Sequence, residues 1–144
     1  MPLSAEVHQY AADLAFKDGE PNRGFEWFEK FAGDCVELGD YITMLTILAY
    51  TKGRTDLPPL FDFLEKCLKS EFEEVRKTAS FFTVPRFLKT SRMGQERLLR
   101  LLIDISEKDP SETVKGLASA GLCMIGRLSE EAFKRSQERS NADP

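Results

Sequence analysis

Residues 74–80 read Glu-Val-Arg-Lys-Thr-Ala-Ser, and residues 113–119 read Thr-Val-Lys-Gly-Leu-Ala-Ser. Val75 and Val114 are 39 positions apart, as are Ala79 and Ala118, and each segment follows a leucine-rich run that ends in Glu-Lys. Repetition at a period of roughly 20 to 50 residues is typical of stacked helical pairs, because one pair cannot bury its apolar face without a similar neighbour. The sequence therefore predicts an extended stack of helices.

Outside these two segments, apolar residues recur three and four positions apart, and no segment alternates apolar and polar residues over the length of a strand. We expect an all-α chain of about eight helices that group into antiparallel pairs. Pro85 interrupts one expected helix and predicts a kink or a break near Phe81. Helix-start signals are expected at Asp40, Ser70 and Asp109.

The carboxy-terminal copy of the pattern resembles a HEAT repeat. It has a leucine-rich first helix over residues 98–104, a turn containing Asp109, Val114 followed by Lys115, and small residues along the second helix. The segment from Leu57 to Ala79 is similar but continues with bulky side chains. The resemblance implies an α-solenoid whose second helices line a concave surface that holds another macromolecule. An irregular helical bundle is the alternative.

The resemblance is clear over residues 56–128 and weaker over residues 1–53, where only Val36 keeps the 39-residue phase. We expect a single HEAT-like helical domain over residues 1–139, with a short last helix near Phe133, and a flexible tail over residues 140–144. Small side chains let helix axes approach closely, and the second helix of the last copy supplies four of them: Gly116, Ala118, Ala120 and Gly121.

The composition points away from catalysis, cofactors and metals. His8 is the only histidine, and three widely spaced cysteines suggest neither a disulfide framework nor a zinc site. The amino terminus lacks the pattern of a signal peptide, and no apolar run is long enough to span a membrane. We expect a cytoplasmic, non-enzymatic protein that requires no cofactor or metal.

Charge is distributed unevenly along the chain. Residues 1–75 hold 15 acids and 7 bases, giving a net charge of −8, whereas residues 76–144 hold 9 acids and 13 bases, giving +4. The only tryptophan lies among the acids of the first half. A tryptophan surrounded by carboxylates is typical of a protein interface with a charged rim. The expected partner-binding residues are Glu20, Glu26, Trp27, Glu29, Asp34, Glu37 and Asp40.

This pattern predicts a module that binds another protein, most simply a basic one. The chain resembles, in its size, acidity and helical content, the bacterial immunity proteins, which neutralise a toxin that is often a basic nuclease. A toxin or nuclease domain is therefore the expected partner.

Two alternatives use other surfaces. A general adaptor or regulatory scaffold would bind through the concave repeat surface near Arg76, Lys77 and Lys115. A nucleic-acid-binding protein would use the seven bases between Arg76 and Arg100, although the acidic composition of the whole chain disfavours it.

Overall fold

The computed structural model describes residues 3–16, 23–51, 58–86 and 95–125. Within these ranges the chain forms seven α-helices and no β-strand, which confirms the predicted all-α class. The expected last helix near Phe133 and the tail lie outside the described residues. The elements are α1 (Ala5–Phe16), α2 (Gly24–Phe31), η2 (Ala32–Asp34), α3 (Leu38–Tyr50), α4 (Pro58–Leu68), α5 (Glu73–Thr78), η3 (Ala79–Thr83), α7 (Gln95–Lys108) and α8 (Glu112–Ile125).

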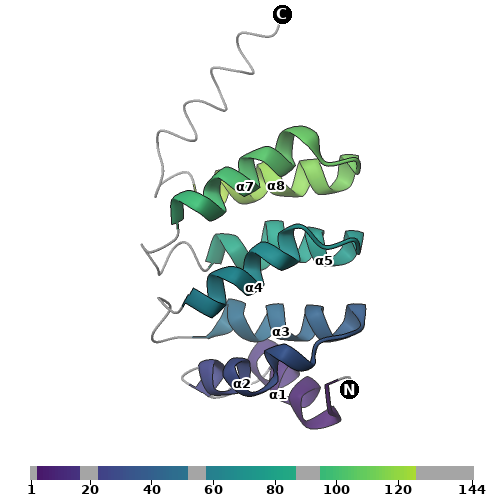
Figure 1. The fold of residues 1–144 in the computed structure, drawn as a ribbon, viewed down its shortest axis with the longest axis vertical. Helices are drawn as coiled ribbons and strands as arrows, with labels where there is room; N and C mark the ends of the chain where they lie inside the picture. Colours follow the sequence, from purple (N-terminus) through teal and green to yellow (C-terminus); the bar gives the residue numbers. More distant parts are fainter. Residues whose placement is uncertain (1–2, 17–22, 52–57, 87–94, 126–144) are drawn as a thin grey trace, which may run out of the picture.

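The helices follow one another along the long axis of the molecule in the order of the sequence (Figure 1). Helix α7 packs along α8, and this pair lies against α4, α5 and η3, with α4 beside α7 and α5 beside α8. Helix α3 contacts α5 and η3 on one side and carries α1 and α2 on the other. Helices α1 and α2 therefore cover the amino-terminal end of the stack.

The two repeated sequence segments occupy equivalent places. Val75 and Val114 are each the third residue of their helices, α5 and α8, and both are fully buried. Ala79 and Ala118, one turn later, are also fully buried. The 39-residue period thus marks the same core position in two neighbouring helices.

The amino-terminal third does not keep this period. Val36, which matches the period in the sequence, lies before α3 and is 57% exposed. The third residue of α3 is Asp40, which lies four residues after the position that the 39-residue period predicts. The N-cap is Glu37 and not, as predicted, Asp40; Asp40 instead completes a capping box as the third helical residue, where its carboxylate accepts the Glu37 N–H at 3.0 Å.

Helix α5, in contrast, begins later than the sequence predicts. Phe72 precedes its first residue, and Ser70 Oγ accepts a hydrogen bond from the Phe72 N–H at 3.1 Å. The predicted capping box starting at Ser70 was therefore wrong. The serine instead orders the turn between α4 and α5.

Asp109 has a tertiary role in place of the predicted cap. Its carboxylate accepts hydrogen bonds from Arg76 Nε at 2.9 Å and Arg76 Nη2 at 3.2 Å, and from the Ser111 N–H at 2.9 Å. Arg76 also donates to the carbonyl groups of Ser70 and Glu71. Both side chains of the ion pair are largely buried. This contact ties the start of α5 to the turn between α7 and α8.

The expected kink near Phe81 takes the form of a π-helical turn, η3, after which the helix continues to Arg86. Pro85 has no N–H to donate to the carbonyl four residues earlier, so a regular α-helical ladder cannot pass through this point. Thr83 Oγ1 donates instead to the buried carbonyl of Leu45 on α3, at 2.9 Å. The irregular turn is thereby fastened to the neighbouring helix.

Candidate docking surface at the amino-terminal end

Four exposed carboxylates follow one another from α2 to the start of α3. Glu26 and Glu29 lie on α2, Asp34 ends η2, and Glu37 precedes α3. We call this set the acidic edge. Within the described ranges, neither Glu29 nor Asp34 forms an ion pair with a base. Glu20, which the sequence analysis also assigned to this surface, lies outside the described residues.

Asp40, in contrast, is 2% exposed and does not belong to the docking surface, which corrects its assignment from sequence. Burial alone would raise the pKa of Asp40, but hydrogen bonds from the N–H groups of Glu37 (3.0 Å), Val36 (3.1 Å) and Leu3 (3.2 Å) outweigh it. The pKa of Asp40 is therefore below its usual value. This carboxylate holds the first residues of the described chain against the start of α3.

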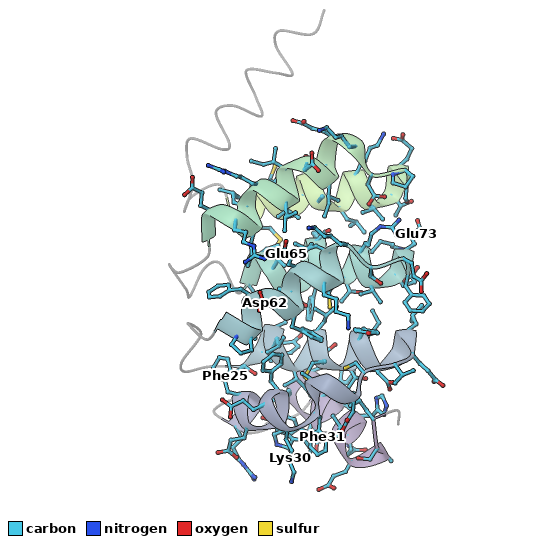
Figure 2. The ribbon with its side chains drawn as sticks, viewed as in Figure 1. Phe25, Lys30, Phe31, Asp62, Glu65 and Glu73 are labelled. Atoms are coloured by element: carbon cyan, nitrogen blue, oxygen red, sulfur yellow. The ribbon has the colours of Figure 1, made fainter. Side chains whose placement is uncertain are left out.

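Trp27 joins α2 to α1. Its indole stacks on the Tyr10 ring with a centroid distance of 4.7 Å and an interplanar angle of 9°, and it contacts the Phe31 ring at 5.5 Å. The side chain is half-buried, so part of it remains available to a partner. Figure 2 places Lys30 and Phe31, its neighbours on α2, at the amino-terminal end of the stack.

The indole lines a small hollow of about 190 Å³ between α1 and α2, which we call the Trp27 hollow. The hollow combines aromatic rings with charged side chains of both signs. Its lining residues are Glu6, Arg23, Glu26, Trp27, Lys30 and Phe31.

His8 has polar neighbours that the sequence did not predict. Its Nδ1 lies 2.5 Å from Thr43 Oγ1, and its Nε2 lies 3.7 Å from Asp40 Oδ1. A hydroxyl, an imidazole and a carboxylate are the groups of a hydrolytic triad. However, Thr43 lies inside α3, where backbone N–H groups are bonded within the helix. The contacts of His8 with Thr43 and Asp40 join α1 to α3.

A second hollow, of about 390 Å³, lies among α1, α3 and η3, and we call it the apolar hollow. Phe16 at its rim is 86% exposed. Phe82 in its wall meets the Tyr50 ring edge to face at 5.5 Å, and the Arg86 guanidinium lies 4.1 Å from the Phe82 ring centre. The lining residues are His8, Ala11, Ala12, Ala15, Phe16, Ile42, Thr43, Thr46, Tyr50 and Phe82.

The alternative basic surface is weaker than the sequence suggests. Arg76 is held by Asp109 and is not a free surface cation, which corrects its assignment to a binding face. Lys77 Nζ lies 3.0 Å from Glu74 on the same helix, and Lys115 is paired in the same way on α8. Each of these two lysines therefore has a carboxylate partner on its own helix.

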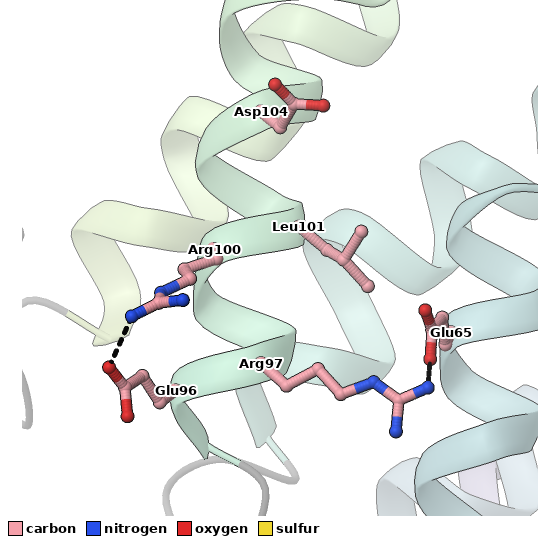
Figure 3. Close-up of a pocket in the computed structure, with 6 residues that line it drawn as sticks. All are labelled: Glu65, Glu96, Arg97, Arg100, Leu101 and Asp104. Atoms are coloured by element: carbon pink, nitrogen blue, oxygen red, sulfur yellow. Dashed lines mark hydrogen bonds and ion pairs between the residues drawn. The ribbon is translucent and has the colours of Figure 1, made fainter.

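Of the three remaining described bases of the Arg76 to Arg100 stretch, Arg97 and Arg100 form ion pairs, whereas Arg86 donates to the Phe82 carbonyl at 2.9 Å. Arg97 on α7 forms an ion pair with Glu65 on α4 and lies 3.8 Å from Asp62, while Arg100 pairs with Glu96 at 2.7 Å (Figure 3). The hydrogen bond from Lys69 and the charge of Arg97 keep the pKa of Glu65 below its usual value despite partial desolvation. These arginines border an open hollow of about 520 Å³ lined by Glu65, Glu96, Arg97, Arg100, Leu101 and Asp104.

The thiols of Cys35 and Cys67 are buried, and burial raises the pKa of each to about 12. Such thiols are poor nucleophiles and poor metal ligands at neutral pH. Cys123 on α8 is exposed. Among the described residues, no three histidine, cysteine or carboxylate side chains are grouped so that they could hold a metal ion.

Comparison with protein-family models, curated proteins and solved structures finds no match to this chain. In the part of the chain that the structure describes, every helix is too short or too polar to cross a lipid bilayer. The function is therefore inferred from the surfaces described above.

Proposed function

We propose that this protein is a non-enzymatic HEAT-like α-solenoid that binds another protein through its acidic edge. The partner would be basic, such as a toxin or nuclease domain. The protein would then act as an immunity or inhibitor protein by covering a cationic active site with negative charge.

Two observations support the solenoid. The pairs α4–α5 and α7–α8 lie side by side, first helix beside first helix and second beside second. The repeated valines occupy the same buried position in the two second helices. A stack of such pairs gains its stability from contacts between neighbours, and the Arg76–Asp109 ion pair is one of these contacts.

The acidic edge is the observation on which the docking proposal depends. Its four carboxylates are exposed on consecutive elements, and among the described residues Glu29 and Asp34 form no ion pair. Clustered charge of one sign accelerates encounter with a partner of the opposite sign, by roughly 10-fold to 1,000-fold at low ionic strength. A basic protein is therefore the partner class that this edge favours.

Charge reversal tests the proposal. Interacting proteins are captured from the native host, and the association rate of each is measured with the triple variant Glu26→Lys, Glu29→Lys and Glu37→Lys. A matched control reverses three exposed acids at the other end of the molecule, Glu96, Asp104 and Glu112.

We expect the edge variant to bind a basic partner about tenfold more slowly at low ionic strength, with little difference at high ionic strength. The control variant should associate at a rate close to that of the wild type. Equal rates for the two variants would exclude the acidic edge as the docking surface.

The apolar hollow favours a second candidate, a general adaptor that holds an apolar segment of its partner. Exposed apolar surface beside a concave site is typical of protein interaction surfaces. Ala12→Arg would fill this hollow without changing the acidic edge. Loss of partner binding by Ala12→Arg together with unchanged binding by the edge variant would select the adaptor.

A further inference from the structure

We propose that the Trp27 hollow binds one cationic side chain of the partner, an arginine guanidinium in preference to a lysine ammonium. This inference rests on the proposed function and names the chemistry of one contact within it. The hollow adjoins the acidic edge, because Glu26 belongs to both.

The size of the hollow fits a single side chain. Pockets for drug-sized ligands and cofactors span roughly 300 to 1,000 Å³, whereas this hollow holds about 190 Å³. Two of its lining residues, Lys30 and Phe31, lie at the amino-terminal end of the molecule (Figure 2).

The aromatic wall supplies the first half of a cation site. Trp27 and Phe31 line the hollow with their rings 5.5 Å apart, and Tyr10, which does not line it, stacks on the indole at 4.7 Å. The face of an aromatic ring attracts a cation, and tryptophan does so most strongly. Because Tyr10 and Trp27 stack across α1 and α2, the wall is held rigidly before a partner arrives.

Carboxylates from two helices supply the second half. Glu6 from α1 and Glu26 from α2 both line the hollow. A forked guanidinium can donate to carboxylate oxygens while its plane stacks on a ring, whereas an ammonium is a compact and strongly hydrated charge. The combination of rings and carboxylates therefore favours arginine.

The chain's own cations show that both kinds of contact are available. Arg23 Nε lies 3.4 Å from Glu26 Oε2, and Lys30 Nζ lies 5.4 Å from the Phe31 ring centre. Both side chains of the Arg23–Glu26 pair are more than half exposed, at 57% and 70%. Exposed pairs of this kind contribute little to stability, so a partner arginine can displace Arg23 from Glu26.

The experiment uses the intact chain, whose only tryptophan reports directly on the hollow. Trp27 fluorescence is titrated with an oligo-arginine peptide and with a lysine peptide of the same length, at fixed ionic strength. The variants are Glu26→Gln and Arg23→Gln, and the matched control is Glu29→Gln, an exposed acid of α2 that does not line the hollow.

We expect the arginine peptide to bind more tightly than the lysine peptide and to change the emission of Trp27. Glu26→Gln should weaken binding of the arginine peptide about three- to fivefold, and this change in affinity corresponds to a loss of just under about 1 kcal/mol, as expected for an exposed ion pair. Arg23→Gln should tighten binding about twofold, because it removes the competing cation. Glu29→Gln should change binding less than Glu26→Gln does.

Equal weakening by Glu26→Gln and Glu29→Gln, or equal affinity for the two peptides, would overturn the hollow as an arginine site and leave the acidic edge standing. If neither peptide bound at low ionic strength, the hollow would be refuted as an arginine site, whereas the acidic edge is decided separately by the association rates of the charge-reversal variants.

Discussion

Gly121→Ala and Gly116→Ala add the same methyl group at two positions of α8, and the structure predicts opposite effects on stability. A Cβ atom at position 121 would overlap the backbone oxygen of Ser80 in η3 and would lie 3.1 Å from Pro85 Cγ. A Cβ atom at position 116 would meet nothing within 4 Å. Both changes gain the helix propensity of alanine over glycine, about 1 kcal/mol.

Gly116→Ala should therefore raise the free energy of unfolding by about 1 kcal/mol. At position 121 the obstacle is backbone that Thr83 fastens to α3, so the cost should lie near the upper end of the roughly 1 to 3 kcal/mol typical of overpacking. After subtracting the gain in propensity, Gly121→Ala should lower the stability by about 2 kcal/mol. The two variants should thus differ by about 3 kcal/mol.

Urea unfolding followed by far-ultraviolet circular dichroism measures this difference. For a slope of about 2 kcal/mol per molar urea, the two midpoints should lie about 1.5 M apart. A Gly121→Ala variant as stable as Gly116→Ala, with an unchanged slope, would show that α8 does not pack closely on η3. The stacking of the last pair on its neighbour would then be refuted.

Three further predictions test other contacts. Asp109→Ala should lower the free energy of unfolding by roughly 3 kcal/mol, because it leaves Arg76 largely buried without its charge partner. In a double-mutant cycle, Asp109→Ala should cost much less stability when Arg76 is already replaced by methionine. Additive losses of stability would contradict the pairing. Because the folded pKa of Asp40 is below its usual value, its contribution to stability should be complete above about pH 4 and decline as the pH falls towards the folded pKa. In urea titrations, Asp40→Asn should lower the stability at neutral pH and weaken its dependence on pH in the acid range. An unchanged dependence of stability on acid pH would contradict this account. In a thiol-titration assay near pH 8, Cys123 should react in the native protein, whereas Cys35 and Cys67 should react only after denaturation. Burial raises the pKa values of these two thiols to about 12. Reaction of all three cysteines at one rate would contradict the described burial.

The close packing of α8 was predicted only in part from the sequence. It assigned four small residues of α8 to close helix contact, and the prediction is confirmed for Ala118 and Gly121, which are buried. It was wrong for Gly116, which is exposed. A small side chain is compatible with close approach but does not require it, so only the position of the neighbouring helix distinguishes the two glycines.

The acidic surface was likewise predicted in part from the sequence. Glu26, Glu29, Asp34 and Glu37 are exposed, as a surface of carboxylates requires. Asp40, which is of the same chemical type and lies in the same stretch, is buried under three backbone donors. Nothing in the spacing of these acids indicated that one of them would replace the valine of the repeat as the third residue of a helix.

Sequence alone determined the helical class and the equivalence of Val75 and Val114, because both follow from apolar periodicity and from similarity between nearby segments. Tertiary structure decided which charged residues are internal. Arg76 meets Asp109 and His8 meets Thr43 only after segments more than 30 residues apart have packed together. Burial and ion pairing depend on these distant neighbours, so they cannot be predicted from the local amino-acid composition.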